Sequence, residues 1–116
     1  MNSRVALYGA VDDELTHYEV DVENFALTKR AMVKAPSNVQ YAWPHPSRRF
    51  LYVATSNRGP GLKADNNHLS AWRIDAHTGA LSPHGEPQSL PMRAVHICLS
   101  PDGDRTQYWV GMVGLP

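Results

Sequence analysis

The 116-residue sequence has a single cysteine, no net charge and no long apolar segment. Without a second cysteine the chain cannot form an internal disulfide, which is typical of a reducing compartment, and we expect a cytoplasmic protein. Eleven basic residues balance eleven acidic ones, so the sequence predicts neither a nucleic-acid partner nor a membrane partner. No apolar run is long enough to span a bilayer, and the N-terminal residues lack the apolar core of a signal peptide.

An amphipathic helical pattern is also lacking, and the periodicity is that of β-strands. Apolar and polar residues alternate through residues 15–22 and 69–75, whereas residues 50–54 form a short continuous apolar run. Nine prolines and eight glycines are spread along the chain, and prolines at 46 and 101 are placed to form tight turns. The sequence therefore predicts an all-β fold.

The most informative positive feature is an internal repeat. Residues 39–48 are similar to residues 94–103, and residues 15–21 are similar to residues 69–75. Asp21 then aligns with Asp75, which gives a period of about 54 residues. A repeat of this length, made of short strands and turns, is the signature of a β-propeller blade.

Each repeat predicts four antiparallel strands, lettered A to D from the innermost strand outwards. The strands expected in chain order are residues 5–10, 15–22, 26–34, 39–43, 50–54, 69–75, 80–88 and 94–99. The first three are strands B, C and D of one blade, and the last is strand A of another. We therefore predict a partial first blade at 4–35, a complete blade at 39–88 and the start of the next at 94–103.

These segments resemble the lactonase family of β-propellers, which includes bacterial 6-phosphogluconolactonase and fungal carboxymuconate cyclase. The resemblance rests on PSRRFLYVA at residues 46–54, LSAWRIDAHTGAL at 69–81 and HICLSPDG at 96–103. It implies a ring of about seven blades, of which this chain would supply about two, as a partial β-propeller.

Two features depart from that resemblance. A seven-bladed ring at this period needs roughly 350 residues, about three times the length of this chain. Residues 104–116 do not continue the repeat, because residues 105–107 do not echo residues 50–52. Two interpretations remain open: a truncated or frameshifted reading frame with an unrelated tail at 104–116, or a divergent strand B shifted to residues 108–110.

The resemblance implies a site of His, Arg and Glu side chains around the central channel, most of them in later blades. Within this chain His96, at the start of the second strand A, is the candidate catalytic residue. Its counterpart one repeat earlier is Tyr41, so the repeat itself does not require a histidine. The alternative interpretation is a packed channel histidine that takes no part in proton transfer.

Arg58, directly after strand B, is the candidate substrate-binding residue, because a guanidinium pairs well with the carboxylate or phosphate of a sugar acid. The alternative is a solvated loop arginine. The histidines and carboxylates lack metal-ligand spacing, and no glycine-rich phosphate loop is present, so the sequence predicts neither a metal nor another cofactor.

By this resemblance the protein is related to enzymes that hydrolyse a sugar lactone, such as 6-phosphoglucono-1,5-lactone, to the acid. We expect the 116 residues to be inactive by themselves, since most of the channel is missing. The alternative is a propeller-derived module without catalysis, which binds or self-associates through open blade faces and edge strands.

Overall fold

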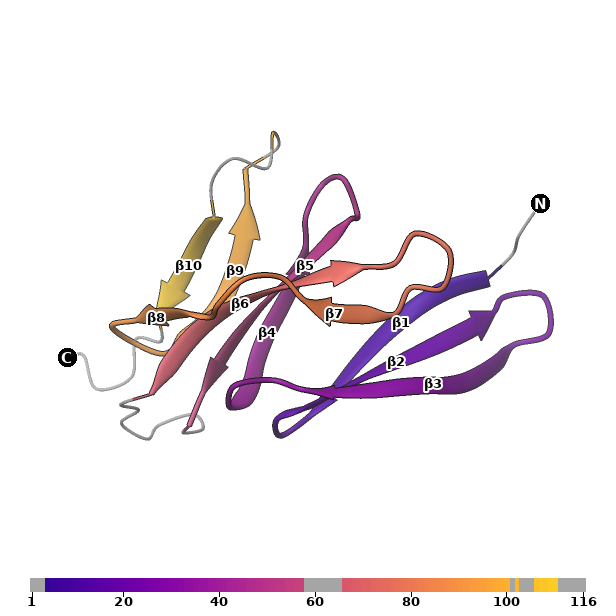
Figure 1. The fold of residues 1–116 in the computed structure, drawn as a ribbon, viewed down its shortest axis with the longest axis horizontal. Helices are drawn as coiled ribbons and strands as arrows, with labels where there is room; N and C mark the ends of the chain where they lie inside the picture. Colours follow the sequence, from indigo (N-terminus) through magenta and orange to yellow (C-terminus); the bar gives the residue numbers. More distant parts are fainter. Residues whose placement is uncertain (1–3, 58–65, 101, 103–105, 111–116) are drawn as a thin grey trace.

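The computed structural model describes residues 4–57, 66–100, 102 and 106–110, which form ten β-strands in three sheets (Figure 1). Within these ranges no helix is long and apolar enough to cross a membrane. The all-β prediction is confirmed.

The first sheet is antiparallel and has the strand order β1-β2-β3. Its strands are β1 (Arg4–Val11), β2 (Glu14–Asp21) and β3 (Ala26–Lys34). They correspond to the strands B, C and D predicted for the first blade. The two connecting turns contain Asp12 and Phe25 at positive φ, the backbone conformation that short hairpin turns require.

The second sheet lies in the part of the sequence predicted to form the complete blade, with β4, β5, β6 and β7 in order and β8 also paired with β6. Its strands are β4 (Asn38–Pro44), β5 (Phe50–Ser56), β6 (Asn67–Ile74), β7 (Leu81–Pro83) and β8 (Gln88–Leu90). The strand D expected at residues 80–88 is therefore two short strands. Pro83 and Pro87 lack the N–H that a ladder needs, and Gly85 turns the chain at a φ of 75°.

The third sheet pairs β9 (Ala94–Leu99) with β10 (Thr106–Val110) in antiparallel fashion. A strand thus follows β9, as the interpretation of a shifted strand B predicts. The strand begins two residues earlier than that interpretation placed it.

Neighbouring side chains of β5 point to opposite faces of the second sheet, and each face packs against another sheet. Leu51 and Val53 pack with Leu15 of β2, whereas Ala54 packs with Ala94 and Ile97 of β9. Both Val53 and Ala54 are fully buried. The three sheets therefore stack face to face, which is how the blades of a propeller contact one another.

The internal repeat has a structural explanation at the turn after strand C. In the second sheet the Asp75 carboxylate accepts hydrogen bonds from the backbone N–H groups of His77 and Thr78, at 2.9 and 2.8 Å. In the first sheet Asp21 accepts equivalent bonds from the second and third residues after it, at 3.1 and 3.2 Å. An aspartate at this point of each repeat therefore stabilises the turn.

One side-chain hydrogen bond fastens the first sheet to this turn of the second sheet. The Tyr8 hydroxyl of β1 donates to the carbonyl oxygen of Gly79 at 2.5 Å. Burial of the phenol raises its pKa, so the hydroxyl stays protonated and able to donate.

Replacing Tyr8 with phenylalanine is expected to lower the free energy of unfolding by about 0.5–1.5 kcal/mol, because a partly buried carbonyl loses its donor. Urea denaturation measures the change. Tyr18→Phe is the matched control, since Tyr18 is on the neighbouring strand and makes no such hydrogen bond among the described residues. Equal losses of stability in the two variants would show that the hydrogen bond does not stabilise the fold.

Candidate functional site

His96 lies on β9, the first strand of the third sheet, and faces β4, the first strand of the second sheet. Its ring centroid lies 4.4 Å from that of Tyr41 and 6.4 Å from that of Trp43, both on β4. The rings of Tyr41 and Trp43 are nearly parallel, with 13° between their planes. The half-buried imidazole of His96 is therefore packed among aromatic rings where two neighbouring sheets meet.

The Nδ1 atom of His96 is buried, and the described part of the chain offers it no hydrogen-bond partner. An imidazole nitrogen normally has a partner when it is buried, so the missing hydrogen bond sets this nitrogen apart from a histidine that is simply packed. Sequence reasoning selected His96 for its place in the repeat, and the structure puts it at a contact between two inner strands.

Sequence reasoning missed a second polar group at the same pair of strands. The Arg93 guanidinium, just before β9, donates to the side-chain oxygen of Gln40 on β4 at 3.0 Å. This bond connects the residue before β9 to β4, next to the rings of Tyr41 and His96, and places a positive charge at this contact between the sheets. The signal available in the sequence was the position of Arg93 three residues before His96, at the entrance to strand A.

Arg58, the candidate for substrate binding, lies outside the described residues. The residue before it, Asn57, is described and pairs with Asn66 through backbone and side-chain hydrogen bonds of 3.1 and 3.3 Å. These bonds join the two ends of the segment that contains Arg58. The role of Arg58 remains a prediction.

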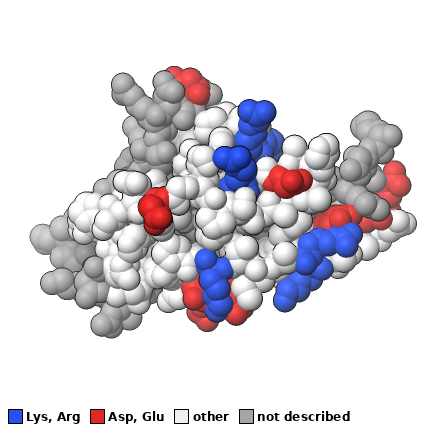
Figure 2. Space-filling model, viewed as in Figure 1, with Lys and Arg blue, Asp and Glu red and all other residues white. Residues whose placement is uncertain are grey.

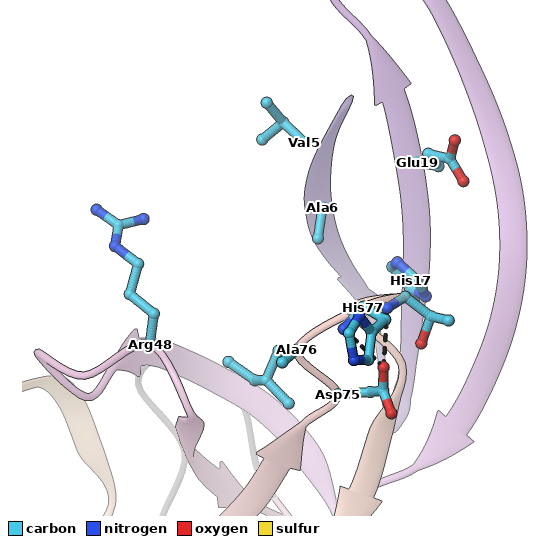
Figure 3. Close-up of a pocket in the computed structure, with 11 residues that line it drawn as sticks. Val5, Ala6, His17, Glu19, Arg48, Asp75, Ala76 and His77 are labelled. Carbon is cyan, nitrogen blue, oxygen red and sulfur yellow. Dashed lines mark hydrogen bonds between the residues drawn. The ribbon is translucent and has the colours of Figure 1, made fainter. Parts of the chain in front are cut away.

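A pocket of about 280 Å³ lies away from His96, between the first two sheets (Figure 3). Its walls come from β1, β2, the β4–β5 turn and the turn after β6; they include His17, Glu19, Arg48, Asp75 and His77. None of its lining residues belongs to β4 or β9. The pocket and the His96 cluster are therefore separate places in the fold.

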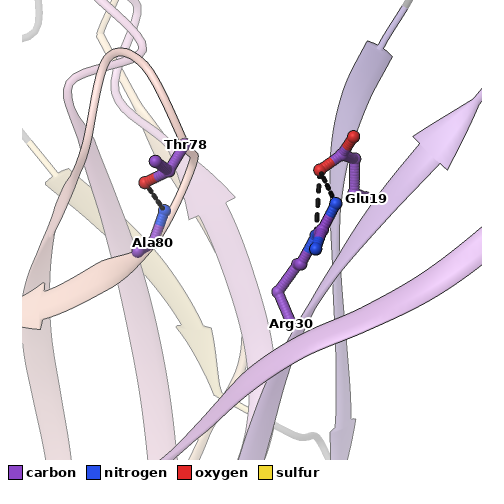
Figure 4. A network of polar contacts seen from close by, with 4 residues as sticks. All are labelled: Glu19, Arg30, Thr78 and Ala80. Carbon is purple, nitrogen blue, oxygen red and sulfur yellow. Dashed lines mark hydrogen bonds and ion pairs between the residues drawn. The ribbon is translucent and has the colours of Figure 1, made fainter.

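The two carboxylates that line this pocket already have partners. Glu19 binds the guanidinium of Arg30 at 2.8 Å, as Figure 4 shows together with the hydrogen bond from the backbone N–H of Ala80 to the hydroxyl of Thr78. The backbone N–H groups of Thr78 and His77 hold the pKa of Asp75 below its ordinary value. Basic and acidic side chains are also interspersed over the face of the molecule in Figure 2. Among the described residues no group of three histidine, cysteine or carboxylate side chains is arranged to hold a metal ion.

The sheets, their order and their face-to-face packing can be compared with known proteins. A family model described as "Lactonase, 7-bladed beta-propeller" matches residues 6–112. The chain belongs to the lactonase family. The repeat, the three stacked sheets and the propeller resemblance found in the sequence agree with this assignment, and the chain has the fold of a partial β-propeller.

A crystal structure of a putative 6-phosphogluconolactonase from Bacteroides fragilis NCTC 9343 has the same fold, with a TM-score of 0.71. The match covers 93% of this lactonase-family chain at 15% sequence identity. The chain spans 29% of the length of that structure. No protein of curated function matches the chain.

Proposed function

We propose that these blades contribute His96 to a site that hydrolyses a sugar lactone, such as 6-phosphoglucono-1,5-lactone, within a seven-bladed ring. The observation that carries the proposal is the unpartnered Nδ1 of His96 at the contact between β4 and β9. Membership of the lactonase family supports the class of reaction. Arg58 is proposed to bind the acidic group of the substrate.

Opening a lactone requires a water molecule that loses a proton as it attacks the carbonyl carbon, and a group that stabilises the resulting oxyanion. A neutral imidazole supplies the first function, because its unprotonated nitrogen accepts the proton. Arg93, held by Gln40, is a candidate for the second function, since its charge lies at the same pair of strands. The remaining channel residues of the ring complete the site.

In a closed ring that contains these blades, His96→Gln is expected to slow lactone hydrolysis by about 10²–10⁴-fold, the usual contribution of a general base. Acid release from 6-phosphoglucono-1,5-lactone measures the rate. His84→Gln is the control, because His84 is exposed and lies after β7, away from β9. The proposal fails if both variants hydrolyse the lactone as fast as the parent ring.

Binding to the 116-residue chain provides a second measurement. When the reaction product 6-phosphogluconate is added, the NMR signals of the His96 ring are expected to shift and those of the His84 ring to stay in place. We expect this chain alone to hydrolyse the lactone no faster than water does. Equal shifts at both histidines would indicate non-specific association with the anion.

A non-catalytic module that assembles through blade faces is the second candidate function. The first sheet exposes apolar side chains on its two edge strands, β1 and β3, namely Val5, Leu7, Val11 and Leu27. Surfaces of this kind are typical of contacts with another protein. An ordered oligomer of this chain without affinity for 6-phosphogluconate would favour this candidate over the lactonase.

A further inference from the structure

His17, at the centre of β2, is a deeply buried polar side chain between the first two sheets. Only 3% of the residue is exposed, and both ring nitrogens are buried. Neither nitrogen has a hydrogen-bond partner among the residues that the structure describes. The ring is packed between the two sheets without any of the hydrogen bonds that a buried imidazole normally makes.

The turn after β6 seals this ring. A Cβ atom at Gly79 would lie 3.0 Å from Nε2 of His17 and 2.8 Å from the Cβ of Ala6, so this turn lies directly against β1 and β2. The Tyr8 ring covers His17 from the side, with 5.6 Å between the ring centroids. Figure 3 shows His17 beside the turn that carries Asp75 and His77, with Arg48 across the pocket.

The titratable and charged groups near His17 do not offer a partner to its protonated form. On β2 and β3, the carboxylate of Glu19 is bound by Arg30. From the turn after β6, the carboxylate of Asp75 is bound by backbone N–H groups.

The remaining groups around the pocket are the phenol of Tyr8 on β1, the imidazole of His77 and the guanidinium of Arg48. None of these three carries a negative charge at neutral pH, since burial raises the pKa of the Tyr8 phenol. A proton on His17 would therefore create a buried cation without a bound anion, which is strongly unfavourable.

We propose that protonation of His17 separates the first sheet from the turn after β6, so that this contact between blades is a pH-sensitive switch. Near the start of β4 the first sheet is held by a 2.8 Å backbone bond from Val39 to Asp12. At the turn after β6 it is held by the hydrogen bond from Tyr8 to Gly79. Opening at the second place exposes the His17 ring to water and leaves the first place intact.

The direction of the pH effect follows from burial. In the closed form, in which the turn after β6 packs on the first sheet, burial lowers the pKa of His17. The Glu19 carboxylate raises this pKa, and the Arg30 guanidinium lowers it. The closed form is therefore fully favoured above the ordinary pKa of histidine and becomes less favoured as the pH falls. Below about pH 6.5, the open form gains by up to about tenfold for each pH unit, as expected for one proton.

The test follows the nuclear Overhauser cross-peak between the Tyr8 ring and Gly79 in the full 116-residue chain from about pH 8 to about pH 5, the range in which histidine titrates. In the wild-type chain this cross-peak is expected to disappear on acidification while the cross-peaks between β1 and β2 persist. His17→Phe removes the titratable ring and is expected to keep the Tyr8–Gly79 cross-peak at every pH. His77→Gln is the control, because it removes an exposed imidazole at the same pocket, and it should behave as wild type.

Two results would overturn the proposal. The first is a wild-type Tyr8–Gly79 cross-peak that survives at about pH 5, and the second is a cross-peak that disappears over the same pH range in His17→Phe. Should His17→Phe fail to fold, the wild-type chain still decides the question through the NMR titration of the His17 ring itself. The ring signal and the Tyr8–Gly79 cross-peak must change together. If the turn separates at a different pH from the one at which His17 gains its proton, this result also contradicts the switch.

Discussion

Replacing Leu15 with alanine is expected to lower the free energy of unfolding by about 2–5 kcal/mol. Leu15 is 2% exposed and is the side chain through which β2 enters the cluster formed with Leu51, Val53 and Trp72 of the second sheet. The substitution leaves a cavity between the two sheets, and rigid sheets cannot move close enough to fill it. Urea denaturation followed by circular dichroism measures the loss of stability.

The matched control is Leu27→Ala on β3, where the leucine is 57% exposed. An exposed leucine contributes little, so this variant is expected to change stability by no more than about 0.5 kcal/mol. The comparison isolates burial between the sheets, because both substitutions remove the same atoms from neighbouring strands. Equal losses of stability in the two variants would mean that the first sheet does not pack on the second as described.

Gly79→Ala is expected to destabilise the chain by about 1–3 kcal/mol more than Gly85→Ala, the usual cost of overpacking a close contact. Both glycines have positive φ, 81° and 75°, so both substitutions carry the same kind of backbone strain. They differ in surroundings: the new Cβ at residue 79 would lie 2.8 Å from the Cβ of Ala6, whereas nothing lies within 4 Å of it at residue 85.

Thermal unfolding of the two variants measures the difference, since the strain common to both cancels. A larger loss of stability in Gly79→Ala supports close packing of the turn after β6 on the first sheet. If the two variants unfold at the same temperature, the turn does not lie against β1 and β2, and the sealed environment of His17 would not exist.

The strands could be predicted from the sequence because their signals are local. Alternation at residues 15–22 predicts the strand and places Leu15 and His17 on one face of β2. That face is the more polar one in the sequence, yet the structure buries both residues there, whereas Val22 on the more apolar face is exposed. Aspartates at 21 and 75 mark the same turn in two repeats because each accepts backbone hydrogen bonds that define that turn. Sheet identity and strand order followed from these signals.

Other features depend on interactions that a repeat does not encode. The bond from Tyr8 to Gly79 joins residues 71 positions apart, and nothing in either repeat signals it. The strand predicted at residues 80–88 is divided into β7 and β8. Two prolines explain this division, and their effect depends on whether a neighbouring strand needs an N–H group at those positions. The ring cluster of His96 with Tyr41 required knowledge of how one sheet lies on the next.

The candidate site shows the same division between local and non-local information. His96 was selected for its place at the start of the second strand A and from the family resemblance, and the structure brings it together with Tyr41, the residue aligned with it one repeat earlier. Arg93 was missed because its importance comes from its partner Gln40, 53 residues away. Equivalent positions of neighbouring blades therefore meet at the inner strands, which explains how a repeat can build a site from non-identical residues.

The most direct test of this account is a nuclear Overhauser measurement between the ring protons of His96 and Tyr41 in the 116-residue chain. The stacked sheets place the two ring centroids 4.4 Å apart, so strong cross-peaks are predicted. The cross-peaks between β4 and β5 within the second sheet serve as the internal reference. Cross-peaks within that sheet but none between His96 and Tyr41 would contradict the stacking of blades that places His96 at the proposed site.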